Sequence, residues 1–231
     1  MTADAIVAPG EPGFRDRFAS GLRGFGPLGL LAILLVLAGI ALSPPIGAVV
    51  VVLWVWLSKT PWRDIGYVRP TSWIGAIAIG IVFGIALKLA MKAIVLPLLG
   101  APPVNTTFHD IAGNPAQLAF FIAYAVIGAG WGEETVFRGW LFERLGKLLG
   151  SNVAVKALIV VIGAALFGAA HWQQGIAGME QGAIIGLIIG TLYMITGRLF
   201  WLMVTHATFD IFAAVIIYFN AETQIAHLVY H

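Results

Sequence analysis

The chain has 231 residues, of which 60% are hydrophobic and only 10% are charged. Soluble domains usually carry roughly 25% charged residues, so most of the surface of this protein must face lipid rather than water. The absence of cysteine excludes disulfides, thiolate metal sites and a cysteine nucleophile, and a net charge of +2 without a polybasic tract gives no indication of nucleic-acid binding.

Apolar segments follow one another along the chain with short connections between them. A helix needs about 20 apolar residues to cross the hydrocarbon layer of a membrane. We therefore expect an all-α, polytopic transmembrane helix bundle of about seven spans. The expected spans are residues 26–42, 46–58, 72–99, 115–138, 153–172, 179–196 and 199–219. Residues 1–25 are expected to be a cytoplasmic N-terminal tail, residues 26–219 a single transmembrane domain, and residues 220–231 a C-terminal tail.

Lysine and arginine residues lie in alternate connections between these spans, which is the signal that orients membrane proteins. The connections at 100–114 and 173–178 contain neither residue. We therefore expect the N-terminus in the cytoplasm and the C-terminus outside, in a membrane that we take to be the bacterial cytoplasmic membrane. Lys88 and Lys92 are exceptions near or within the third span, and they either snorkel to the interface or line a cavity.

Glycine recurs every four residues through the sixth span, at Gly178, Gly182, Gly186 and Gly190. Such a stripe lets another helix approach closely, so we interpret it as a packing face. The sequence contains no Gly-rich phosphate loop and no HExxH zinc helix. These observations leave the ionisable residues within the spans as the carriers of function.

Two adjacent carboxylates lie in the stretch Trp131–Arg138 of the fourth span. Ionisable side chains are costly in a membrane, so they are functional candidates. Glu134 and Arg138 are four residues apart and share a helix face, so they can pair, whereas Glu133 points about 100° away. Glu133 is then the carboxylate left for chemistry, as a general base. The structural alternative is an ordinary helix end that leaves the membrane.

Two histidines and an aspartate are the other functional candidates within the spans. His171 ends the fifth span, and His206 precedes Asp210 by four residues in the seventh. An interfacial histidine and a structural His–Asp hydrogen bond are the alternatives to a catalytic role. Antiparallel helices would bring Glu133 and His171 to similar heights, whereas His206 requires a kink or a staggered helix to reach them. The histidines and carboxylates expected to be solvated and non-functional are His109, Asp110, Glu180, His227 and His231.

Three motifs in this order resemble those of the CPBP family, which comprises the CAAX prenyl endopeptidases and the bacterial Abi and bacteriocin-immunity proteins. The motifs are Glu133-Glu134-x-x-x-Arg138, Phe167-x-x-x-His171 and His206-x-x-x-Asp210. The segment Trp62–Tyr67 is similar to the one that precedes the core of the family. The resemblance covers residues 60–219 and implies a membrane-embedded endopeptidase that needs no cofactor.

The resemblance also implies roles for individual residues. Glu133 and His171 would activate a water molecule. His206 and the residue at position 210 would stabilise the oxyanion that forms on the attacked carbonyl. The residues that would support the site or contact the substrate are Glu134, Arg138 and Phe167.

Position 210 departs from the pattern of the prenyl endopeptidases, in which asparagine is common, because this chain has Asp210. An ionised aspartate cannot donate a hydrogen bond to an oxyanion. Asp210 is then either protonated in its apolar setting or it orients His206. We expect orientation, because that role uses the ordinary charge state of the carboxyl group.

Three alternatives to a metal-free peptidase follow from the same residues. The chain could be a non-catalytic immunity or binding protein that keeps the motifs. It could be a zinc metalloprotease, with Glu133, His171 and His206 as ligands. A proton-relaying transporter would show inverted internal repeats, and the sequence has none. The expected partners are membrane lipid and a peptide or membrane-protein substrate, and no nucleic acid.

Overall fold

The computed structural model describes residues 13–230 of the chain, and within this range it is helical without strands. In chain order the elements are α1 (Phe14–Arg23), α2 (Pro27–Leu42), α3 (Pro44–Ser58), η1 (Trp62–Ile65), α4 (Trp73–Ala90), η2 (Met91–Val95), α5 (Leu96–Leu98), η3 (Thr106–Ile111), α6 (Pro115–Tyr124), η4 (Ala125–Glu133), η5 (Thr135–Leu141), α7 (Phe142–Leu149), α8 (Val153–Ala170), η6 (Trp172–Gln174), α9 (Gly175–Thr196), α10 (Phe200–Tyr218) and α11 (Glu222–Ala226). The expected all-α transmembrane bundle is confirmed.

The number of spans is close to the expected seven but differs at the N-terminal end. Five helices of the described range are long and apolar enough to cross a membrane, or six if α1 and α2, which meet at 57°, form one broken span. Helices α2 and α3 have only 16 and 15 residues. At 1.5 Å per residue each is about 23 Å long, short of the roughly 30 Å hydrocarbon layer. They form a hairpin because Pro44 begins α3 directly after Ser43.

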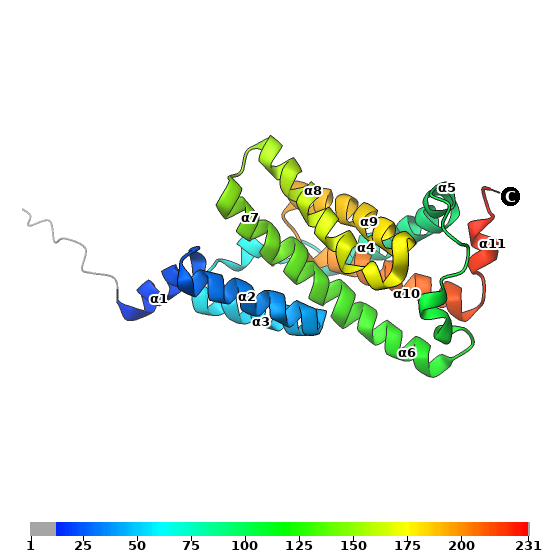
Figure 1. Ribbon diagram of the computed structural model, residues 1–231, viewed down its shortest axis with the longest axis horizontal. Helices are drawn as coiled ribbons and strands as arrows, with labels where there is room; N and C mark the ends of the chain where they lie inside the picture. Colours follow the sequence, from blue (N-terminus) through cyan, green and yellow to red (C-terminus); the bar gives the residue numbers. More distant parts are fainter. Residues whose placement is uncertain (1–12, 231) are drawn as a thin grey trace, which may run out of the picture.

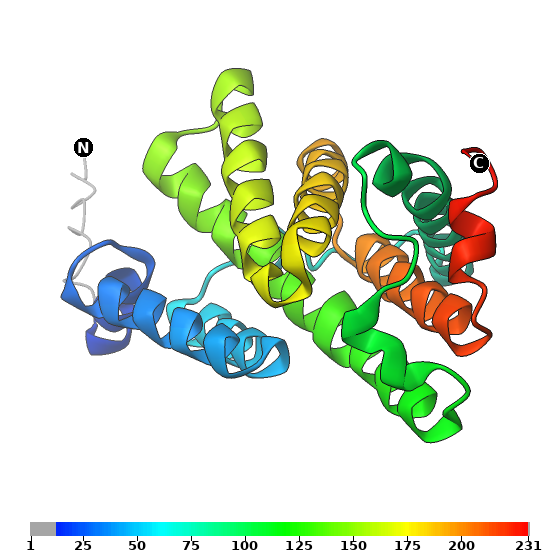
Figure 2. The ribbon, with the colours of Figure 1, turned by 45° about the vertical axis from the view of Figure 1, so that its right-hand side comes forward.

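One continuous helix of 35 residues, Pro115–Leu149, runs diagonally through the molecule and is called the long helix below (Figure 1). The other spans pack around it as pairs: α2 with α3, α4 with α10, and α8 with α9 (Figures 1 and 2). The long helix contacts α3, α8 and α10. It therefore brings all three pairs to its middle, where the Glu133–Glu134 motif lies.

The middle of the long helix is π-helical over Ala125–Glu133 and Thr135–Leu141. Wide π turns are rare and are often found at functional sites. The sequence in the first of these segments is rich in glycine and alanine, and this lets α10 approach. A Cβ atom added to Gly130 would lie 2.7 Å from the Met203 carbonyl oxygen on α10. Close contact with α10 is therefore built into the helix next to the motif.

The glycine stripe of α9 packs against α8, as its spacing predicted. A Cβ atom added to Gly186 would lie 2.8 Å from the Cα atom of Ala164, so a larger residue would push the two helices apart. Together with α4 and α10, this pair surrounds the main buried cluster, which includes Phe167, Ile189 and Leu202.

Helix α10 is staggered relative to the long helix, which is how His206 reaches the motif. The helix lies in the same half of the molecule as α4, α5 and α11 (Figures 1 and 2). Its N-terminal turns therefore pack beside the middle of the long helix rather than beside its end. Of the two routes expected for His206, a kink or a stagger, the fold uses the stagger.

Within the described residues, the segments expected as tails contain helix α1 at the N-terminal end and helix α11 at the C-terminal end. Residues 1–12 and 231 lie outside the described part of the chain. Helix α1 is tied to the end of α3, because Arg23 donates to the Ser58 carbonyl and Lys59 Nζ lies 2.8 Å from Asp16 Oδ1. At the other end, α11 is anchored by Glu222, which is 5% exposed. Its partner is discussed with the site.

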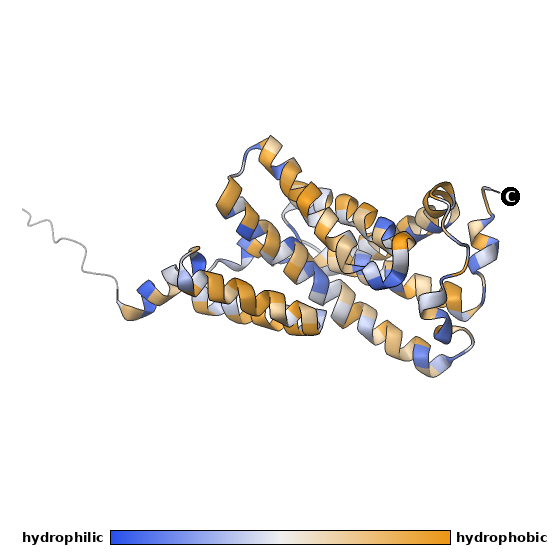
Figure 3. Cartoon of the chain, in the orientation of Figure 1, coloured by the Kyte–Doolittle hydropathy of each residue, from blue (hydrophilic) through white to orange (hydrophobic). Residues whose placement is uncertain are grey.

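Large apolar side chains cover the outside of the bundle. Leu34, Ile74 and Val82 are 62%, 82% and 69% exposed. Figure 3 shows hydrophobic colour along the outer helices and hydrophilic colour in the middle of the long helix and at the turn after α8. In water such a surface would be unstable, so the protein is integral to a membrane, with its polar residues turned inward.

Candidate active site

A cavity of about 600 Å³ opens between α4, α9, α10 and the long helix. Its lining includes the four residues expected to carry the chemistry, which are Glu133, His171, His206 and Asp210. The remaining charged residues of the motifs, Glu134 and Arg138, lie behind this wall and are 0% and 1% exposed. Two helices, the long helix and α10, and the end of a third, α8, thus deliver the motif residues to one place.

Glu134 links two of these elements through a single oxygen. Its Oε1 atom lies 2.7 Å from Arg138 NH1 and 2.7 Å from His206 Nδ1. The pairing of Glu134 with Arg138, expected from their spacing, is confirmed. The expected orientation of His206 by Asp210 is not: Asp210 Oδ2 is 3.8 Å from His206 Nε2, which is too long for a hydrogen bond. The ring is held by Glu134, which the stagger of α10 brings against Nδ1.

Phe167 fills the space between the charged groups and is 2% exposed. Its ring centroid lies 4.2 Å below the Arg138 guanidinium, in a cation–π contact. The ring also meets His171 and His206, with centroids at 4.7 Å and 5.7 Å. Phe167 therefore sets the spacing of both histidines and covers the buried arginine.

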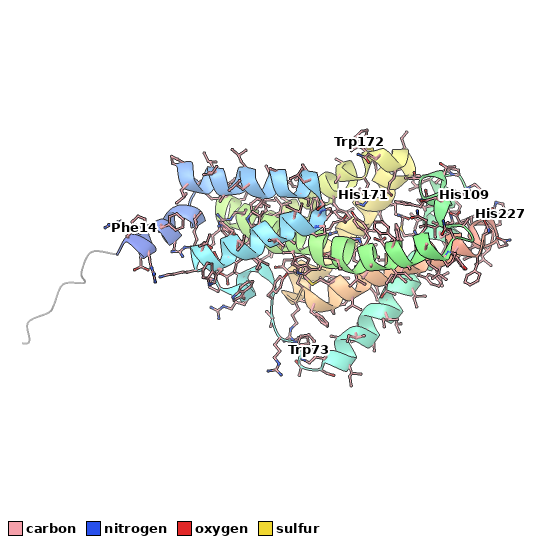
Figure 4. The ribbon with its side chains drawn as sticks, turned by 90° about the horizontal axis from the view of Figure 1, so that it is seen from below. Phe14, Trp73, His109, His171, Trp172 and His227 are labelled. Atoms are coloured by element: carbon pink, nitrogen blue, oxygen red, sulfur yellow. The ribbon has the colours of Figure 1, made fainter. Side chains whose placement is uncertain are left out.

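His171 lies at the end of α8, with its ring fixed by the helix that carries it. Its Nδ1 atom is 2.7 Å from the Phe167 carbonyl oxygen. A carbonyl can only accept, so Nδ1 carries the proton and Nε2 of the neutral ring is an acceptor. Gly182 makes room for the ring, because a Cβ atom there would lie 3.1 Å from Nδ1. Figure 4 shows His109 and His227 at the far end of the molecule, well separated from His171.

Glu133 differs from its neighbour in having no close partner. Its Oε2 atom is buried and has no hydrogen-bond partner among the described residues. The nearest cationic group in ion-pair range is His206 Nε2, at 3.9 Å. The two adjacent carboxylates thus differ as expected: Glu134 is bound through Oε1 by arginine and histidine, whereas Glu133 lines the cavity and has no arginine partner.

Residues 115–212 match the family model described as type II CAAX prenyl endopeptidase Rce1-like. The matched segment contains all three motifs. The match covers less than half of the chain and supports the resemblance to the CPBP family. It indicates a CAAX protease-like peptidase, which is a hydrolase. Comparisons with curated proteins and with solved structures gave no match.

The matched segment is joined to Trp62–Tyr67, which precedes it, by a small hydrogen-bond network. Tyr67 OH lies 2.8 Å from Thr135 Oγ1 and accepts from Trp131 Nε1 at 2.8 Å. Burial raises the pKa of the Tyr67 phenol above its usual value, so the hydroxyl is protonated at neutral pH. Thr135 and Trp131 flank the two glutamates, so this network holds the long helix next to the motif. The roles of Tyr67 and Thr135 were not predicted.

Lys88 of α4 and Lys92 of η2 also line the cavity. Of the two expectations for these lysines, snorkelling to the interface or lining a cavity, the structure shows the second. Lys92 Nζ donates to the Pro103 carbonyl and lies 3.2 Å from Glu222 Oε1, which also accepts from Asn105 N–H at 2.9 Å. This network ties the connection after α5 and helix α11 to the rim. Lys88 Nζ donates to Gln181 Oε1 on α9 at 3.2 Å. Asp110, expected to be solvated, is exposed and also lines the cavity.

Few side chains of this site are placed to bind a metal ion together. Within residues 13–230, no group of three or more His, Cys, Asp or Glu residues has the spacing to hold a metal ion. Glu133, His171 and His206, the expected ligands of a zinc enzyme, share the cavity, with His206 Nδ1 already taken by Glu134. A zinc mechanism is therefore an alternative that chelation tests directly.

Proposed function

We propose that this protein is an intramembrane endopeptidase that hydrolyses a peptide bond with a water molecule activated by Glu133 and His171. One observation carries the proposal: Glu133 lines the cavity and its Oε2 atom has no hydrogen-bond partner among the described residues, while Glu134 lies outside the cavity lining with its Oε1 atom bound by Arg138 and His206. A free carboxylate that faces an imidazole acceptor can take a proton from water without a serine or cysteine nucleophile.

The first step needs two acceptors for one water molecule. Glu133 accepts one proton, and His171 Nε2 accepts a hydrogen bond from the other hydrogen and orients the molecule. The hydroxide oxygen forms a bond to the carbonyl carbon, and the carbonyl π electrons move onto its oxygen. When the C–N bond breaks, the proton held by Glu133 passes to the leaving amine. The products are a carboxylic acid and an amine, and Glu133 returns to its starting form.

His206 supports the negative charge that develops on the carbonyl oxygen. With both ring nitrogens protonated, Nδ1–H donates to Glu134 and Nε2–H is available to the oxyanion. Glu133 and Asp210, at 3.9 Å and 3.8 Å from Nε2, attract the positive charge of this form. Asp210 thus stabilises the positive charge on the His206 ring, and it needs no hydrogen bond of its own to the substrate.

Membrane peptidomics tests the proposal in cells. Peptides from membrane fractions are compared between cells that express the wild-type protein and cells that express Glu133→Ala. His227→Ala is the matched control, because His227 is exposed at the far end of the molecule. We expect a set of fragments that is present with the wild type and the control and absent with Glu133→Ala. Identical profiles in all three would instead favour a non-catalytic immunity or binding protein.

A further inference from the structure

Lys88 places a positive charge in the wall of the cavity, outside the three family motifs. Its side chain comes from α4 and is 8% exposed. The Nζ atom donates to Gln181 Oε1 at 3.2 Å and lies 4.5 Å from the ring centroid of Phe209. None of the ion pairs within residues 13–230 involves Lys88.

Lys92, one helical turn further on, differs from Lys88 because its charge is balanced by a carboxylate partner. It lies 3.2 Å from the carboxylate of Glu222, and both side chains are nearly buried, at 8% and 6% exposure. The cavity therefore contains one cation with a carboxylate partner and one held only by an amide oxygen and an aromatic face. A buried ammonium without a counter-ion is costly, so an anionic group that entered the cavity would be stabilised beside Lys88.

The geometry of Gln181 adds a second donor at the same place. Its amide oxygen is occupied by Lys88, so the amide nitrogen, which carries two hydrogens, is free to donate into the cavity that Gln181 also lines. The carboxylates of Glu133 and Asp210 line the same cavity and repel an anion, and Asp210 also acts electrostatically on Lys88, so an entering carboxylate needs the direct hydrogen bonds that Lys88 and Gln181 offer. Lys88 and Gln181 thus define the wall at which a carboxylate is accepted.

We propose that Lys88 and Gln181 form a carboxylate-binding subsite for the substrate. This inference rests on the proposed endopeptidase function and names the substrate class: apolar peptides with a carboxylate close to the scissile bond. The Phe209 ring contacted by Lys88 is next to Asp210 in sequence, so the subsite lies beside the reacting centre. The carboxylate is either the C-terminal α-carboxylate or an Asp or Glu side chain, and the probes below distinguish the two.

Direct binding tests the subsite without turnover. All variants carry Glu133→Gln, and the probes are fluorescein-labelled apolar pentapeptides of one sequence in three forms. These are a C-terminal acid, a C-terminal amide, and the amide with glutamate at the penultimate position. We expect the acid, the glutamate peptide or both to bind about 10- to 100-fold more tightly than the plain amide in fluorescence anisotropy, as for a lost hydrogen bond to a charged group.

Substitutions assign this preference to the two residues. Lys88→Met should abolish it, Lys88→Arg should retain part of it, and Gln181→Met should weaken it. Lys147→Met, at an exposed lysine of α7, is the matched control and should leave it unchanged. Each variant is first checked by thermal melting, so that the Arg and Gln181 variants still decide the question if Lys88→Met does not fold.

Two outcomes would overturn the subsite: equal binding of all three peptides, or a preference that survives in Lys88→Met. Preference for the acid alone assigns the α-carboxylate, and preference for the glutamate peptide assigns a side chain. Cleavage assays with proteins that keep the wild-type Glu133 separate this inference from the proposed function. A protein that cleaves acid and amide peptides equally refutes the subsite alone, whereas one that binds carboxylates but cleaves nothing refutes the peptidase alone.

Discussion

Glu134 Oε1 lies 2.7 Å from His206 Nδ1, although the two residues are 72 positions apart in the sequence. The bond joins the long helix to α10 and is fully buried, since the two side chains are 0% and 4% exposed. The same oxygen binds Arg138 NH1 at 2.7 Å. Glu134 is therefore the centre of a buried charge network that fixes the ring of His206 from behind the cavity.

Removal of this charge should destabilise the fold. Glu134→Gln leaves Arg138 buried without its carboxylate, and breaking a buried pair in this way costs about 3–5 kcal/mol. We expect a clear fall in melting temperature in detergent, together with reduced activity. The matched control is Glu180→Gln on α9, a residue outside this network and outside the cavity lining. A Glu134→Gln protein that melts like the wild type would contradict the network as described.

Glu133 should behave in the opposite way. Its Oε2 atom has no partner among the described residues, so Glu133→Gln removes no hydrogen bond that holds the fold together. The melting temperature should stay near that of the wild type. Turnover of a reporter peptide should fall by the roughly 10²–10⁴-fold typical of a lost general base. Near-normal turnover in this variant would rule out Glu133 as the base.

Asp210 should tolerate replacement by asparagine. The carboxylate is 3.8 Å from His206 Nε2 and makes no hydrogen bond to it. Asparagine, which is common at this position in the prenyl endopeptidases that the motifs resemble, can itself donate to an oxyanion. We expect Asp210→Asn to remain within about tenfold of wild-type turnover, whereas Asp210→Leu should lose about 10²-fold, because leucine neither attracts the positive charge of His206 nor donates to the oxyanion in its place. Equal loss in both variants would show that the carboxylate itself is required.

The sequence predicted those features that depend on local spacing. The spacing of four residues from Glu134 to Arg138 on one helix was enough to predict that these two side chains pair and that Glu133 does not pair with Arg138. Contacts that depend on how helices stagger were not predictable. The hydrogen bond between Glu134 and His206 is one of these: the sequence pattern pointed to Asp210, which lies 3.8 Å from the ring, and gave no sign of Glu134. Lys88 with Gln181 and Lys92 with Glu222, which are 93 and 130 positions apart, are further examples.

The number of spans shows a second limit of the pattern. Residues 27–42 and 44–58 are apolar throughout, which predicts membrane helices. Their length is set by the two prolines after Ser43 and by the polar connection at Lys59, and this makes them shorter than the hydrocarbon layer. Composition identifies apolar helices, but the position of a turn decides whether each one crosses.

Chelation separates the metal-free mechanism from the zinc alternative. If Glu133 and His171 activate water on their own, activity should be unchanged after incubation with EDTA and with 1,10-phenanthroline. The zinc content of the purified protein, measured by mass spectrometry, serves as the control. Stoichiometric zinc that is lost in His206→Ala, together with inactivation by chelators, would establish a metalloprotease with His206 as a ligand.

The basic residues predict the orientation of the protein in the membrane. Because of the fold, this prediction is the same whether or not the short α2–α3 hairpin crosses the membrane. Lys59, at the end of α3, lies 2.8 Å from Asp16 in α1, so both ends of the α2–α3 hairpin lie on the same side of the membrane. The five longer helices then separate the connection at 60–72 from the C-terminus. An odd number of crossings puts these two on opposite sides, and the lysines and arginines put the connection in the cytoplasm. We expect a reporter fused after Gly150 to report the cytoplasm and one fused at the C-terminus to report the outside. Reporters that agree on one side would show that one of the three helices after Gly150 does not cross, whereas a reversed pair would show that the basic residues do not set the orientation.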